Sequence, residues 1–197
     1  MQALVKACKK QNWPARIVAI ISNKIESIGL KWAYSKNIVT EIIDSKNFYD
    51  LIEYEMYLSK RIEFYKPTYI LLAGFKKILT SKFINFFNGR LINIHPSLLP
   101  CFPGLSTHQK ALSIGVQIHG CTVHFVTQGL DSGFIIAQGC VPVLSGDNVK
   151  ILSKRLLRIE NFVYTSAVRW LVNNYILLDD NNLIVVKNKL NRLFYSF

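Results

Sequence analysis

The chain has 197 residues, 50% of them hydrophobic and 18% charged, which excludes a disordered chain and suits one compact domain that needs neither disulfides nor a metal to fold. Its 24 Lys and Arg residues exceed its 12 Asp and Glu residues, but the basic residues are scattered and no nucleic-acid-binding module accompanies them, so we expect no nucleic-acid partner. No apolar run approaches the roughly 18 residues of a membrane span and the first residues carry no signal-peptide pattern, so we expect a cytoplasmic protein without membrane association.

The first half of the chain alternates segments of helical periodicity with short apolar runs. In residues 2–10 the apolar positions recur at helical spacing, and Pro14 follows that segment. The continuous apolar run over residues 16–22 has the length and composition of a strand buried on both faces of a parallel sheet. The same patterns predict helices over residues 29–36, 47–65 and 81–87, and strands over residues 38–43, 69–73 and 91–94.

The second half begins with a stiff loop that contains Pro96, Pro100 and Pro103. After this loop we expect a helix over residues 108–114, strands over 120–127 and 134–143, a helix over 148–173, and a hairpin over 175–186 that turns at 179–182. Alternating helices and buried strands predict an α/β fold, a three-layer sandwich with a mostly parallel, Rossmann-like sheet. We expect residues 1–173 to form this domain and residues 174–197 a C-terminal hairpin and tail.

The cysteines indicate free thiols. Cys8, Cys101, Cys121 and Cys140 show no CxxC or CxxH spacing, so we expect no metal site. Unpaired thiols are typical of a reducing compartment.

Asn93 and His95 end the strand predicted over residues 91–94. Because they are two residues apart, their side chains leave the strand on the same face. In a sheet of this kind ligands bind beyond the carboxyl ends of the strands. An amide donor beside a protonated imidazole suits the stabilisation of a developing oxyanion. On this spacing alone, His95 can equally be a strand-end histidine that bonds a backbone carbonyl.

Further motifs extend this pair into a wider pattern. The motifs are Asn93-Ile-His-Pro-Ser-Leu-Leu-Pro100, Phe102-Pro-Gly-Leu-Ser-Thr-His108, His119-Gly-Cys-Thr-Val-His124 and Leu130-Asp-Ser-Gly133. Together with Ser22-Asn-Lys24 and Leu72-Ala-Gly-Phe75, these motifs resemble the folate-dependent formyltransferases, and the resemblance runs without gaps from residue 2 to about residue 172.

Within this family the chain resembles the branch that formylates glycinamide ribonucleotide. Methionyl-tRNA formyltransferases carry Arg-Gly where this chain has Pro103-Gly104, and formyltetrahydrofolate hydrolases carry His-Ser-Phe where it has Pro96-Ser-Leu98. The resemblance implies the formyltransferase fold and transfer of a formyl group from 10-formyltetrahydrofolate to the amine of glycinamide ribonucleotide, in purine biosynthesis. It implies two small-molecule substrates, direct attack by the amine and no metal, and it leaves open a monomer or a homodimer.

The resemblance also implies roles for individual residues. Asn93 would hold the formyl oxygen, His95 would be the general acid, and Asp131 would stabilise the charged imidazole. His124 alternates along its strand with Cys121, Val123 and Phe125, so we expect it to point away from them and to support the site. On the resemblance Glu160 meets the ribose hydroxyls, although on a long helix it can also be a solvated surface residue. The residues implied for folate binding are Lys76, Lys77, Ile78, Leu79, Leu91, Asn93 and Thr127.

The opening of the chain departs from the family pattern. Family members begin with a strand and a Gly-rich loop that binds the ribonucleotide phosphate at a helix N-terminus, whereas only Met1 precedes the first helix predicted here. We therefore expect the first strand and the phosphate loop to be missing and one position in the sheet to be unfilled. Two explanations stay open, a start upstream of Met1 or a genuine loss. A genuine loss would leave a truncated, non-catalytic remnant that binds folate.

Overall fold

The computed structural model of the protein describes residues 1–75, 77–179, 183–187 and 189–196. None of the helices in these ranges is long and apolar enough to cross a membrane. The helices are α1 (Gln2–Lys10), α2 (Ile28–Tyr34), α3 (Leu51–Phe64), α4 (Ser81–Phe86), α5 (Thr107–Ile114) and α6 (Val149–Val172), with the 3₁₀ helix η1 (Ser45–Asn47) before α3. The strands are β1 (Ile20–Ser22), β2 (Thr40–Ile42), β3 (Ile70–Leu71), β4 (Leu91–His95), β5 (Ile118–Phe125), β6 (Ile135–Pro142), β7 (Ile176–Leu178), β8 (Ile184–Val186) and β9 (Leu193–Tyr195).

The largest sheet has the strand order β3-β4-β5-β6-β9. The pairs β3–β4 and β6–β9 are parallel, and the pairs β4–β5 and β5–β6 are antiparallel. Within this sheet, therefore, β5 alone runs against the other strands. The predicted α/β fold with a mostly parallel sheet is confirmed.

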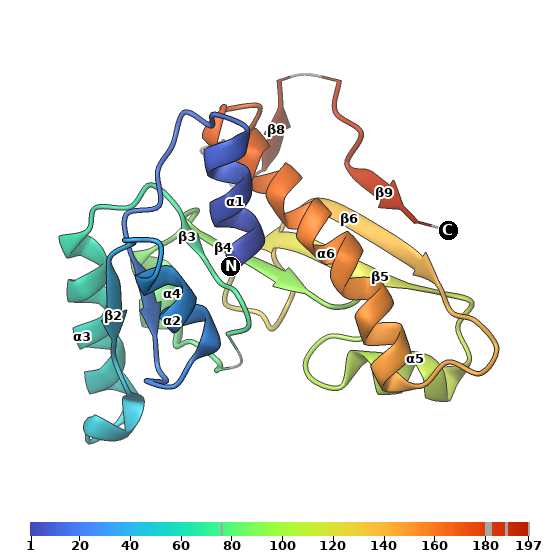
Figure 1. The fold of residues 1–197 in the computed structure, drawn as a ribbon, viewed down its shortest axis with the longest axis horizontal. Helices are drawn as coiled ribbons and strands as arrows, with labels where there is room; N and C mark the ends of the chain where they lie inside the picture. The colour runs from blue at the N-terminus through green and yellow to red at the C-terminus, as the bar shows by residue number, and fades with distance from the viewer. Residues whose placement is uncertain (76, 180–182, 188, 197) are drawn as a thin grey trace.

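Successive residues of β4 face different helical layers, which makes the domain a sandwich. The side chain of Leu91 packs with residues of α3 and α4, whereas that of Ile92 packs with residues of α1 and α6. Figure 1 shows α6 lying across β5 and β6, with α1 beside it. From α6, the hydroxyl of Tyr164 donates to the carbonyl oxygens of Leu72, 2.9 Å away, and Ile92, 3.1 Å away. The ends of β3 and β4 are thus tied to the α6 layer.

The sheet is interrupted between β1 and β3. In the described ranges β1 pairs only with β2, in parallel, and β3 pairs only with β4. The strands β1 and β2 therefore form a two-stranded sheet of their own. The prediction that the run 16–22 is a strand buried on both faces is wrong, because only Ile20–Ser22 form a strand and their side chains are partly buried. The strand predicted over residues 69–73 is likewise shorter, and the side chains of Ile70 and Leu71 are partly buried. A strand without a neighbour along one edge also lacks, on each face, the side chains of that neighbour that would cover its own.

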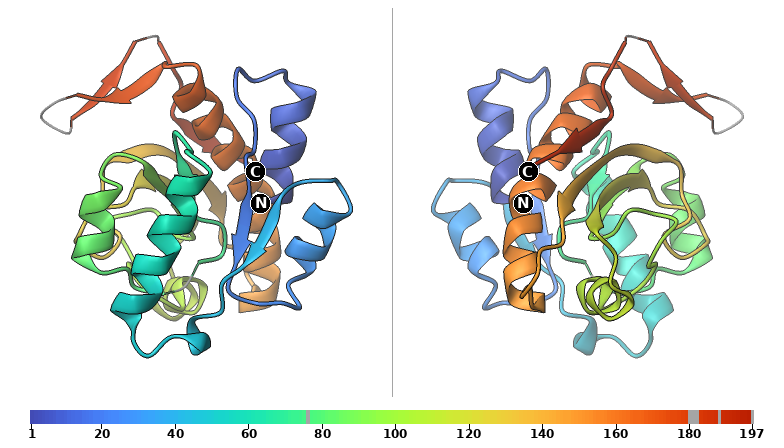
Figure 2. Two further views of the ribbon diagram at one scale, coloured as in Figure 1. Left: turned by 90° about the vertical axis from the view of Figure 1, so that its left-hand side faces the viewer. Right: turned by 90° about the vertical axis from the view of Figure 1, so that its right-hand side faces the viewer.

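Two other segments differ from the predicted elements. The helix predicted over residues 47–65 divides into η1 and α3, because Asp50 has an extended backbone and its carboxylate accepts the N–H of Glu53 as an N-cap. The hairpin predicted over residues 175–186 corresponds to the antiparallel pair β7–β8, and residues 180–182 of its turn lie outside the described ranges. After the hairpin the chain returns to the large sheet, where β9 lies along β6 (Figures 1 and 2).

Candidate active site

The antiparallel register of β4 and β5 places Asn93 directly opposite His124. Their side chains leave the sheet on the face away from α6, because Cys121, Val123 and Phe125 of β5 fill the core on the α6 side. Nδ2 of Asn93 lies 3.4 Å from Nε2 of His124. The amide and the imidazole therefore contact each other at the carboxyl end of β4.

His124 is held as a neutral ring. It is 2% exposed, and burial lowers its pKa because a charged imidazole loses hydration there. Its Nδ1 donates to the carbonyl oxygen of Phe125 over 2.9 Å, so its proton is at Nδ1 and a lone pair is at Nε2. This lone pair accepts from the amide of Asn93, which fixes the orientation of the amide group. The second amide hydrogen stays available to another acceptor.

His95 lies between two acceptors. Its Nδ1 is 3.3 Å from Oδ2 of Asp131, and its Nε2 is 3.0 Å from the carbonyl oxygen of Phe102. His95 is 6% exposed, so both contacts are shielded from water. A doubly protonated ring would present one N–H to each of these acceptors, and this is the form that a general acid needs.

Asp131 is itself held by the main chain. Its Oδ2 accepts the backbone N–H of Gly104 at 2.8 Å, and its Oδ1 lies 3.9 Å from Nε2 of His124. The backbone at this end of the site is strained, since φ is +48° at Asp131, +53° at Phe102 and +60° at Ser106. Left-handed conformations of residues other than glycine cluster at functional sites, where surrounding contacts enforce them.

The loop after His95 is anchored by Thr122, which is fully buried. Oγ1 of Thr122 donates to the carbonyl oxygen of Ser97 at 2.7 Å and accepts the N–H of Leu99 at 3.0 Å. From β6, Nε2 of Gln138 donates to the same Oγ1 and to the carbonyl oxygen of Leu99, each at 3.0 Å. One side chain from each of β5 and β6 therefore holds this loop.

The residues that the sequence assigns to folate lie in different surroundings. Lys76 lies outside the described residues. Nζ of Lys77 contacts Oγ of Ser45 and lies 5.2 Å from the ring centre of Tyr54. The other assigned residues are an exposed Ile78, a half-buried Leu79 at the α3–α4 cluster, a fully buried Leu91 whose carbonyl accepts the N–H of Val126, and Thr127, whose Oγ1 lies 3.3 Å from Oγ of Ser132.

Glu160 lies on α6, the helix that packs against β5 and β6. It is half-buried, and desolvation raises the pKa of its carboxyl. The structure therefore brings together Asn93, His95, Asp131 and His124 and places Glu160 on the opposite face.

Sequence reasoning missed the backbone groups of Phe102 and Gly104 as members of the site. Gly104 has a φ of +76°, and the Pro-Gly pair in front of Leu105 was the signal for such a turn. The hydrogen bond from His95 to the Phe102 carbonyl could not be predicted from the sequence, because every residue carries the same main-chain carbonyl.

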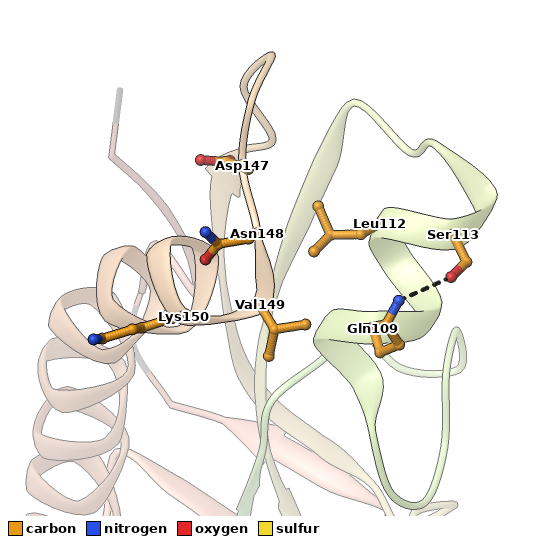
Figure 3. A pocket seen from close by; sticks show the side chains of 7 residues that line it. All are labelled: Gln109, Leu112, Ser113, Asp147, Asn148, Val149 and Lys150. Carbon is orange, nitrogen blue, oxygen red and sulfur yellow. Dashed lines mark hydrogen bonds between the residues drawn. The ribbon is translucent and has the colours of Figure 1, made fainter.

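A separate cavity of about 570 Å³ lies between α5 and the start of α6 (Figure 3). Gln109 and Ser113 line it on one side, and Asn148 and Lys150 on the other. Nε2 of Gln109 donates to Oγ of Ser113 at 3.2 Å. The lining includes none of the residues predicted for the site, so this cavity is distinct from the Asn93–His95–Asp131 group.

The chain is similar to known proteins along most of its length. The formyl transferase family model matches residues 1–168. Over 181 residues the chain is 38% identical to the phosphoribosylglycinamide formyltransferase of Escherichia coli (strain K12), a match that covers 92% of this chain and 85% of that protein. Over 184 residues it is 38% identical to the trifunctional purine biosynthetic protein adenosine-3 of Homo sapiens, with 93% of this chain and 18% of that protein covered.

Solved structures give the same result. The phosphoribosylglycinamide formyltransferase of Anaplasma phagocytophilum superposes with a TM-score of 0.90 at 34% identity, covering 99% of this chain and 91% of that one. The enzyme of the same name from Brucella melitensis superposes with a TM-score of 0.83 at 42% identity, covering 87% and 88%. Because the family model matches most of the chain and a full-length relative is 38% identical to it, the chain belongs to the formyl transferase family.

Proposed function

We propose that this protein transfers the formyl group of 10-formyltetrahydrofolate to the amine of glycinamide ribonucleotide. The observation that carries the proposal is the contact of His95 with Asp131 at 3.3 Å, beside an Asn93 amide that His124 orients. Family membership and the names of the relatives support the same reaction and substrate.

In the proposed reaction the lone pair of the substrate amine attacks the formyl carbon, and the C=O electron pair moves onto the formyl oxygen. The free amide hydrogen of Asn93 donates to this oxygen as its negative charge develops. The tetrahedral intermediate then collapses, the bond from carbon to N10 of the folate breaks, and N10 takes up a proton. The attacking nitrogen loses a proton, so the amine becomes a formamide and tetrahydrofolate leaves.

His95 supplies the positive charge and the proton for this sequence. The carboxylate of Asp131, held by the Gly104 N–H, stabilises the charged ring where water is excluded. Because no protein nucleophile is needed, catalysis depends on positioning and on these fixed donors.

The remaining assignments are part of the proposal. Lys77, Ile78, Leu79, Leu91 and Thr127, with Lys76, would contact the folate, and Glu160 would contact the ribose. All four cysteines are free, which suits a reducing compartment, and we propose the cytoplasm. Residues 1–173 would form the catalytic domain of a monomer or homodimer, with the C-terminal hairpin and tail appended.

The test is a steady-state assay of tetrahydrofolate release with both substrates, run on the purified chain. The substitution His95→Ala is expected to lower kcat by about 100-fold or more, because removal of a general acid typically costs 10²–10⁴-fold. The substitution Cys101→Ser, at an exposed position of the same loop, is the matched control and leaves kcat unchanged. Full activity of His95→Ala would refute the mechanism. Folate binding without turnover by the native chain would instead identify a non-catalytic remnant.

A further inference from the structure

Two histidines that the proposed reaction does not use lie in contact behind the loop that follows His95. Nδ1 of His108, on α5, is 3.0 Å from Nε2 of His119, on β5. The rings meet edge to face, with centroids 5.2 Å apart and an interplanar angle of 82°. His119 is 1% exposed, so this contact is buried.

The hydrogen bonds of the pair run in one direction. Burial lowers the pKa of His119 to about 4 and also lowers that of His108, so both rings are neutral at pH 7. His119 donates one N–H to the carbonyl of Pro96. Since Nε2 faces His108, the donor is Nδ1, and Nε2 accepts the Nδ1–H of His108. The two hydrogen bonds, from His108 to His119 and from His119 to Pro96, therefore end at the residue next to His95.

His119 also contacts the second partner of His95. The ring of Phe102 packs against the ring of His119, with centroids 6.3 Å apart. The carbonyl oxygen of Phe102 accepts from Nε2 of His95 at 3.0 Å. His119 thus contacts the loop both at Pro96, next to His95, and at Phe102, whose carbonyl accepts from His95.

We propose that His119 is a positioning residue for His95, which fixes the Pro96 carbonyl through a ring that His108 holds in place. The proposal rests on the proposed function only for its kinetic readout. The buried polar ring keeps the main chain beside His95 in one conformation, because releasing Pro96 leaves an N–H unpaired in a water-free site.

Two amides separate the hydrogen bonds of His119. In His119→Asn the amide nitrogen takes the place of Nδ1 and keeps the bond to Pro96, whereas in His119→Gln the amide oxygen takes the place of Nε2 and keeps only the bond from His108. We expect His119→Gln to lower kcat by about tenfold or more, since small misplacements can cost up to about 100-fold, with KM for both substrates changed less than about twofold. We expect His119→Asn to retain kcat within about threefold. Equal losses in the two variants, or a change in KM alone, would overturn the proposal.

A second variant covers the case in which both substitutions prevent folding. His108→Ala removes the donor to Nε2 and leaves His119 and Pro96 in place, and a kcat reduced by about threefold is the expected result. An unchanged kcat would count against the proposal.

The nuclear magnetic resonance signals of the His95 ring test the positioning without turnover. They are expected to shift in His119→Gln and to stay in place in His119→Asn. A native chain that transfers no formyl group would sink the proposed function, whereas ring signals that move alike in both variants would sink the positioning role of His119.

Discussion

Oδ2 of Asp131 lies 3.3 Å from Nδ1 of His95 and at the same time accepts the N–H of Gly104 at 2.8 Å. The carboxylate is therefore oriented by the main chain and does not depend on the imidazole for its position. A partner fixed in advance stabilises a developing charge without the cost of reorganisation.

Removing the charge of Asp131 is expected to disable the site without unfolding the protein. Asp131→Asn keeps the size of the side chain and an oxygen for Gly104, and we expect kcat to fall by about 100-fold, the order found when one fixed electrostatic partner is removed. Kinetics and circular dichroism of the variant test this. Glu26→Gln removes one negative charge at an exposed position and serves as the control. A variant that keeps a tenth of the native kcat would contradict the assignment.

Asn93→Asp tests the amide donor. The carboxylate has the shape of the amide but no N–H, and it faces the lone pair of His124 at 3.4 Å. We expect a loss of about 10²–10³-fold in kcat, comparable to the removal of an oxyanion donor. Steady-state kinetics at saturating substrate measure it, and a loss below tenfold would exclude Asn93 as the oxyanion donor.

Thr122→Val is expected to destabilise the protein through its effect on the loop after His95. Valine fills the same volume but leaves the N–H of Leu99 and one amide hydrogen of Gln138 unpaired in the interior. The free energy of unfolding should fall by about 2–3 kcal/mol, the usual cost of an unsatisfied buried donor. Urea unfolding gives the value, and Thr122→Ser, which retains the hydroxyl, is the control. A change below about 1 kcal/mol would show that the network contributes little.

Stability should decrease on acidification because of His119. Its pKa is about 4 in the folded protein and 6.5 ordinarily, so the unfolded chain takes up its proton first as the pH falls. The contribution of His119 is therefore fully present above pH 6.5 and is lost as the pH falls towards 4, with about 2 kcal/mol gone at pH 5. Urea unfolding at pH 7 and pH 5 measures the loss, which should shrink by this amount in His119→Asn. An identical pH dependence in the variant would contradict the prediction.

Glu55 is expected to set the geometry of the segment proposed for folate. It is 3% exposed, and its carboxylate accepts both the N–H of Thr80, at 2.9 Å, and the hydroxyl of the same residue. Glu55→Ala removes both acceptors at the end of the stretch Lys77–Leu79. We expect KM for the folate to rise by about tenfold with little change in kcat, since a bond to a charged acceptor contributes about 1.5–3 kcal/mol. Glu55→Gln keeps an oxygen for Thr80 and should restore most of the affinity. A loss confined to kcat would contradict this role.

Much of the site could be predicted from short-range patterns. The two-residue spacing of Asn93 and His95 places them on one face in any strand, and the alternation along β5 turns His124 away from its apolar neighbours. These features depend only on the geometry of one strand. Apolar periodicity likewise located α1, α4 and α6 to within about two residues.

The missing parts depend on contacts between distant segments. The pairing of Asn93 with His124 follows from the register of β4 against β5, and no local pattern sets that register. Phe102 and Gly104 act through main-chain atoms, which every residue shares. The strand β9 is three residues long, and its pairing with β6 across more than fifty residues leaves no trace in local composition.

The bond from His95 to the Phe102 carbonyl has a consequence for how a ligand enters. A substrate oxygen that takes up this proton arrives in exchange for a backbone carbonyl, so one acceptor replaces another and the N–H is never bare. In the free protein, the Phe102 carbonyl therefore competes with a substrate oxygen for the Nε2 proton of His95. Because φ of Phe102 is +53°, the competing carbonyl belongs to a residue in a strained, left-handed conformation.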